Sequence, residues 1–91
     1  MSQTSEVNHP QLLHFVRYRW DKIRNQHQIV YPEGVLVLNE TGAEIVKRMD
    51  GRDFDTLVAD LEQVFNAEGL RDDVTDFLKG LFDHGLLKDA A

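Results

Sequence analysis

The sequence predicts an α+β fold in which a three-stranded antiparallel sheet is followed by three helices, in the order βββααα. Two observations carry this prediction. Apolar and polar residues alternate over residues 16–20 and again over residues 27–31, which is the period of half-buried strands, and an apolar run follows at residues 35–38. From residue 42 onward, apolar residues recur every three or four positions, which is the period of helices that bury one face.

The first strand is predicted from its two faces. Val16, Tyr18 and Trp20 fall on one face, and Arg17 and Arg19 fall on the other. Such a pattern is typical of a strand with one face on the core and one face in water. Together with Lys22 and Arg24, these arginines form a modest basic cluster, which we interpret as a solvated face and not as a nucleic-acid footprint.

A turn and an apolar strand follow the second strand. Pro32 presets φ for a turn over residues 31–34, and Gly34 tolerates a positive φ, which favours a type I hairpin turn closed by a bulge. Residues 35–38 are then apolar on both faces, although helices can cover only one face of a three-stranded sheet. This strand is either enclosed by the core or is an edge strand that receives another chain.

Each helix has a start signal and a stop signal. Asn39 is a candidate cap for the first helix, with Thr41 and Glu44 as an alternative capping box one step later. Asp53 is a candidate cap for the second helix, whose apolar period holds for three turns. The predicted stops of the three helices are Gly51, Gly69 and Gly85.

Length and composition indicate one small domain. The chain has 91 residues, 16 acidic and 10 basic side chains, a net charge of −6 and no cysteine. The lack of cysteine excludes a disulfide framework and a thiolate nucleophile. No apolar run approaches the roughly 20 residues of a membrane span, so we expect a cytoplasmic protein that does not enter a membrane.

The sequence offers few groups for catalysis. Its four histidines lack the i, i+4 spacing of a helical metal site, and its only serines are Ser2 and Ser5. There is no glycine-rich loop of the kind that cradles phosphates. We therefore expect a protein that is not an enzyme and that holds neither a cofactor nor a metal.

A winged helix-turn-helix protein has a comparable mixture of small helices and a β-ribbon, so nucleic-acid binding is an alternative. The last predicted helix would read the groove. Its charged residues are mostly acidic, which opposes contact with phosphates, so we expect no nucleic-acid partner. These residues are Arg71, Asp72, Asp73, Asp76, Lys79 and Asp83.

Four short motifs resemble successive signatures of the pyrroloquinoline quinone biosynthesis protein D (PqqD) family. Their order and spacing match that family from Pro10 to Leu87, so the resemblance covers most of the chain. The motifs are Arg17-x-Arg19-Trp20-Asp21, Tyr31-Pro32-Glu33-Gly34, Leu38-Asn39-x-Thr41-Gly42-Ala43-Glu44-Ile45 and Asp50-Gly51-Arg52.

The resemblance implies a peptide chaperone. Members of this family bind the precursor peptide of pyrroloquinoline quinone and present it to a radical S-adenosylmethionine enzyme, and their fold also serves as a recognition element for other ribosomally made peptides. In such elements the peptide adds to the third strand beside the third helix. Carried over to this chain, the peptide-binding residues are Val35, Leu36, Val37, Leu38, Asp73, Val74, Phe77, Leu78 and Leu81.

One departure from the family concerns the N-terminal segment. The family places a glycine just before its first strand, where this chain has His14 and Phe15. We therefore expect a flexible arm over residues 1–15, followed by a peptide-recognition domain over residues 16–88. An extended arm beside an open sheet edge favours a homodimer formed by strand or arm exchange.

Overall fold

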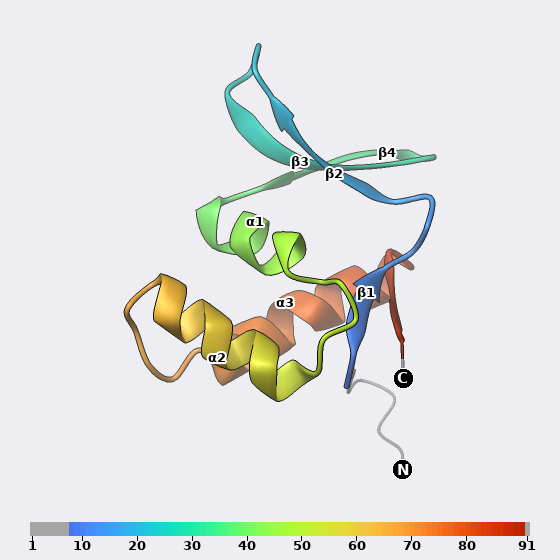
Figure 1. Cartoon of the computed structure of the whole chain (residues 1–91). Coiled ribbons are helices and arrows are strands. Elements are labelled where there is room, and N and C mark those ends of the chain that lie inside the picture. The colour runs from blue at the N-terminus through green and yellow to red at the C-terminus, as the bar shows by residue number, and fades with distance from the viewer. Residues whose placement is uncertain (1–7, 91) are drawn as a thin grey trace.

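The computed structural model describes residues 8–90 and has two layers, a sheet and a set of helices (Figure 1). The three-stranded antiparallel sheet has the order β2-β3-β4, so β4 lies at an edge. All three helices lie on the same side of this sheet (Figure 1). The predicted fold class is confirmed. The bounds are β2 Arg17–Asp21, β3 Gln26–Tyr31, β4 Gly34–Leu38, α1 Glu40–Lys47, α2 Phe54–Val64 and α3 Arg71–Asp83.

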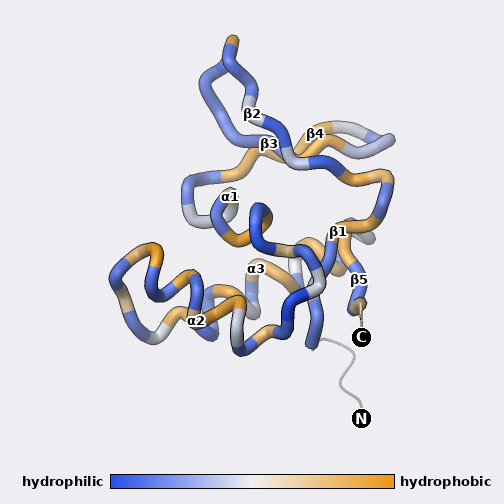
Figure 2. The backbone as a smooth tube through the Cα atoms, in the orientation of Figure 1, coloured by the Kyte–Doolittle hydropathy of each residue, from blue (hydrophilic) through white to orange (hydrophobic). Residues whose placement is uncertain are grey.

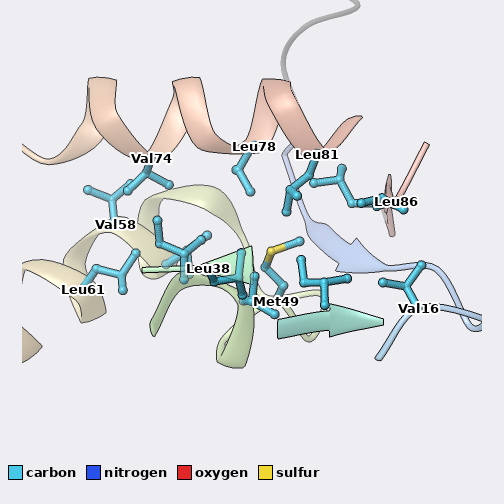
Figure 3. Close-up of a cluster of buried hydrophobic side chains, with 14 residues drawn as sticks. Val16, Leu38, Met49, Val58, Leu61, Val74, Leu78, Leu81 and Leu86 are labelled. Carbon is cyan, nitrogen blue, oxygen red and sulfur yellow. The ribbon is translucent and has the colours of Figure 1, made fainter. Parts of the chain in front are cut away.

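The hydrophobic core lies between the sheet and the helices. Figure 3 shows Val74, Leu78 and Leu81 of α3 pointing into this core, toward Leu38 of β4 and Met49 beyond α1. Each of these five side chains is buried. The core therefore joins the end of β4 to α3 through apolar packing, which is the main stabilising term in a domain of this size.

The helix starts follow the predicted caps. The Asn39 side chain accepts the N–H of Gly42 at 2.7 Å, and the Asp53 side chain accepts the N–H of Thr56 at 3.3 Å. Both caps satisfy a backbone donor that has no partner within its helix. The alternative capping box is not formed, because Glu44 instead pairs with Arg48 at 2.7 Å.

Two loop details differ from the expectation. The first helix ends at Lys47 and not near Gly51, because the backbone N–H of Arg48 turns back to Ile45 and Val46. The register pairs Tyr31 directly with Gly34 across a two-residue loop, so the predicted bulge is absent.

The predicted N-terminal arm is too long. Pro10–Leu12 form a strand, β1, which pairs antiparallel with β5, Leu87–Asp89, in a second small sheet. The Asp89 carboxylate also accepts the backbone N–H groups of Asn8 and His9 at 3.1 and 3.0 Å. Residues 10–12 thus belong to the folded domain, and residues 1–7 of the predicted arm lie outside the described residues.

Candidate functional site

The β4 strand divides its side chains between the two faces of the sheet. Leu38 is buried in the core and Leu36 packs against it. Val35 and Val37 point to the opposite side and are 52% and 57% exposed. The interpretation that the core encloses this strand is therefore wrong for these two valines, and the interpretation of β4 as an edge strand is correct.

The free edge of β4 presents backbone groups at two residues. Tyr31 and Gly34 close the two-residue loop, and such a closing pair exchanges backbone hydrogen bonds. Hydrogen-bonded and non-bonded pairs then alternate along an antiparallel ladder. The N–H and C=O groups of Val35 and Val37 therefore point away from β3, where an added strand would meet them.

The predicted helical wall is partly a core element. Val74, Leu78 and Leu81 are 2 to 3% exposed, so their side chains serve the core. Asp73 is exposed and Phe77 is half-buried. Of the five α3 residues predicted to contact a peptide, these two are the accessible ones.

Phe77 connects the wall to the end of β4. A Cβ atom built on Gly42 in the first turn of α1 would lie 2.9 Å from Phe77 Cε1. Only a glycine leaves room for the ring at that position. Gly42 lies four residues after Leu38, so the Phe77 ring of α3 packs against the first turn of α1, directly after the end of β4. Gly42 belongs to one of the four family motifs, but nothing in the sequence indicates Phe77 as its neighbour.

A polar and aromatic cluster around His27, near the turn between β2 and β3, connects these strands to α1. The Tyr18 hydroxyl lies 2.7 Å from His27 Nδ1, and the Glu40 carboxylate lies 3.4 Å from His27 Nε2. The Trp20 ring meets the His27 ring edge-on at a centroid distance of 4.8 Å. Because His27 pairs with the last residue of β4, this cluster fixes the point where the strand passes into the helix.

A buried carboxylate, Asp21, lies where the β2 strand enters the hairpin turn and accepts several hydrogen bonds. Asp21 accepts the backbone N–H groups of Ile23 and Arg24, at 3.0 and 3.1 Å, and the amide of Gln28 at 3.1 Å. The backbone N–H of Arg24 is the main reason that the pKa of Asp21 lies below its ordinary value. These bonds define the conformation of the hairpin turn.

Arginines and valines share the side of the sheet that faces away from the helices. We call this side the outer face. The register places Arg17 opposite Val30 and Val30 opposite Val35, and it places Arg19 and Val37 on either side of Gln28. The outer face comprises Arg17, Arg19, Asp21, Gln26, Gln28, Val30, Val35 and Val37, and Arg19 lies 3.7 Å from the Asp21 carboxylate.

The groups that the site presents suit recognition of an extended chain. Within the described part of the chain, no group of three or more His, Cys, Asp or Glu residues could hold a metal ion. The same part contains no helix long and apolar enough to cross a membrane. What the site offers is an open strand edge, a half-buried aromatic ring and an acidic helix face.

Comparison with known proteins assigns the family. The family model of coenzyme PQQ synthesis protein D (PqqD) matches residues 26–87. The chain belongs to the PqqD family. The match begins with β3, so the first strand of the sheet lies outside it, although individual relatives align over more of the chain.

Relatives of this PqqD-family chain are named for the molecule that they bind. A "PqqA binding protein" of Azotobacter vinelandii is 37% identical over 81 residues, which cover 87% of this chain and 88% of that protein. A "PqqA binding protein" of Klebsiella pneumoniae is 43% identical over 65 residues, covering 69% of this chain and 71% of its own length.

A solved structure of a family member has the same fold. The solution NMR structure of the PqqD truncation of Methylobacterium extorquens PqqCD superposes with a TM-score of 0.75 at 29% identity, and 88% of each chain is covered. That protein is described as a functional, stand-alone recognition element for ribosomally synthesized and post-translationally modified peptides.

Proposed function

We propose that this protein is a peptide chaperone that binds the PqqA precursor peptide and presents it to the radical S-adenosylmethionine enzyme of pyrroloquinoline quinone biosynthesis. The observation that supports the proposal most strongly is the open edge of β4 in a chain whose relatives are named PqqA binding proteins. Backbone bonds to an added strand give affinity, and neighbouring side chains give specificity.

The proposed binding mode uses both sides of the β4 edge. The peptide would pair with the outward backbone groups of Val35 and Val37. Its side chains on the helix side would meet Leu36, the Phe77 ring and the Asp73 carboxylate. The remaining predicted contacts, Leu38, Val74, Leu78 and Leu81, would support these groups from the core, since they are buried.

The charge of α3 argues for a peptide over a nucleic acid. Arg71 at the start of α3 is already paired with Asp55 of α2. Four exposed aspartates outnumber the remaining cation, Lys79, along the helix that a winged helix-turn-helix protein would insert into the groove. Contact with phosphates would therefore lack the cations that normally provide its affinity.

The proposal is tested first by an amide NMR titration of the labelled protein with the precursor peptide. We expect shifts at residues 35–38 together with Asp73 and Phe77. Shifts confined to the hairpin residues 17–24, or shifts caused only by DNA and abolished by salt, would contradict the peptide-binding site. A precursor peptide from another ribosomal-peptide system serves as the specificity control.

A second test removes one donor from the edge. Val37→Pro deletes a backbone N–H that faces away from β3, a position where a strand tolerates proline. We expect the affinity for the peptide to fall by at least about tenfold, since one bond is lost and the ring blocks the approaching strand. Val37→Thr keeps the N–H and the branched shape and is the matched control. Unchanged affinity in a folded Val37→Pro variant would exclude strand addition at this residue.

A further inference from the structure

No helix of the described chain covers the outer face of the sheet (Figure 1), although Gln28 and Asp21 on this face are buried. All helices lie on the opposite side, and no helix or strand among residues 8–90 packs over it (Figure 1). Val35 and Val37 are more than half exposed there, and Arg17 and Arg19 are exposed beside them. Arginine is enriched at protein interfaces, and the buried centre of an interface is apolar, so this combination of side chains fits an interface.

The charge of this region is opposite to that of the whole protein. The net charge is −6, yet four of the ten basic residues lie within residues 17–24. Arg17 and Lys22 form no ion pair within the described chain, so their charges remain available to a partner. The outer face therefore fits a partner surface with an apolar centre and an acidic rim.

The hairpin that carries these charges projects beyond the body of the protein (Figure 1). Figure 2 shows that its tip is hydrophobic between hydrophilic segments, and Ile23 in the turn is 94% exposed. The Asp21 carboxylate fixes the turn through the N–H groups of Ile23 and Arg24. An exposed aliphatic side chain on a fixed turn loses little conformational entropy on binding, which suits an anchor residue.

A peptide added to β4 would enlarge the outer face. Successive residues of a strand point to opposite faces of the sheet, so alternate peptide side chains would lie beside Val35 and Val37. We propose that the outer face and the hairpin tip bind the enzyme that modifies the peptide, and that the bound peptide completes this docking surface. The proposal rests on the peptide-binding function, because the added strand must be present at β4.

A second copy of the chain fits this face poorly. A twofold contact pairs the same surface on both subunits, so two copies of one positively charged face would lie against each other. Juxtaposed like charges disfavour such a contact. A partner with acidic side chains has no such conflict, and it gains from the peptide strand that a free copy lacks.

The test is calorimetric titration of the pathway's radical S-adenosylmethionine enzyme with this protein, with and without the precursor peptide. We expect the peptide to raise the affinity for the enzyme at least about threefold, and the enzyme to raise the affinity for the peptide equally. Arg17→Glu and Ile23→Asp should each weaken enzyme binding at least about tenfold and leave the dissociation constant of the peptide within about twofold. Lys88→Glu reverses an exposed charge on β5 and is the matched control.

The outcomes separate the two proposals. If the unaltered protein does not bind the peptide, both proposals fail. If it binds the peptide, but Arg17→Glu and Ile23→Asp bind the enzyme as well as Lys88→Glu does, the docking surface alone is refuted. If the enzyme does not bind at all, the docking surface and the presentation step of the proposed function both fail, while peptide binding stands. A salt-sensitive affinity for a DNA duplex that Arg17→Glu removes would assign the face to nucleic acid and overturn the proposal.

Discussion

Gly42→Ala tests whether the contact between α1 and Phe77 is as close as the structure indicates. The added Cβ would lie 2.9 Å from Phe77 Cε1, 3.3 Å from Cζ and 3.2 Å from the Asn39 side-chain oxygen. Carbon atoms pack best at about 3.5–4.0 Å, so the ring of Phe77 would have to move by a substantial fraction of an ångström. The substitution therefore overpacks the junction between β4, α1 and α3.

The magnitude follows from two opposing terms. Overpacking a core site costs about 1–3 kcal/mol, and alanine gains at most about 1 kcal/mol over glycine in a helix. We expect a net loss of about 1 kcal/mol in the free energy of unfolding, which for a domain of this size lowers the melting temperature by about 4–8 °C. The measurement is thermal unfolding followed by circular dichroism.

Gly80→Ala is the matched control, because it is the same substitution within α3. A Cβ atom on Gly80 would meet nothing within 4 Å, so only the helix preference remains and the melting temperature should rise. A rise for Gly42→Ala as well would refute the close contact. Phe77→Leu in the Gly42→Ala background should recover part of the loss, with a coupling energy of at least about 0.5 kcal/mol in a double-mutant cycle.

Three carboxylates give further predictions. Hydrogen bonds from the Arg52 side chain lower the pKa of Asp50 from 3.8 to about 2. The pair thus stabilises the fold above pH 3.8 and loses this effect as the pH falls through about 2, so Asp50→Asn should lower the melting temperature at pH 7 but not at about pH 2. Asp21→Asn keeps the shape but loses the charge, and it should speed amide hydrogen exchange at Ile23 and nearby turn residues while α2 exchange stays unchanged. Asp89→Asn should speed amide exchange in β1, and equal protection in the variant would show that β1 is held by backbone pairing alone.

Local chemistry explains what the sequence could predict. The cap at Asn39 needs only a side-chain oxygen within reach of an N–H three residues later, and Asp53 satisfies the same condition. The apolar period then determines which face of each helix is buried, as Leu57 and Leu61 in α2 illustrate. Both signals lie within a single element, so no knowledge of the tertiary structure is required.

Long-range pairing explains what the sequence could not predict. Pro10–Leu12 has no alternation, and its partner Leu87–Asp89 lies at the other end of the chain. Nothing in either segment alone specifies the other. In the same way, both Gly42 and Gly80 lie within helices, but only Gly42 has a close neighbour, Phe77, which is distant in the sequence.

The sequence indicates which segments form the candidate peptide site, and the burial of each side chain shows which of their residues a peptide could reach. Periodicity alone cannot tell a core stripe from a binding wall, because both require apolar residues at helical spacing. Val74, Leu78 and Leu81 therefore appeared equivalent to Phe77 in the sequence. The packing of α3 distinguishes them, since those three side chains are buried and Phe77 is only half-buried.

The β4 strand is apolar on both faces because each face has a different role. Leu36 and Leu38 face the helices and hold the strand on the core, while the outward backbone groups of Val35 and Val37 leave its edge free to pair. A strand that was polar on its outer face would keep the same register, but its added partner would have no aliphatic neighbours there. The two valines thus join the peptide edge to the outer face, and this shared position is the reason to expect peptide and enzyme binding to be coupled.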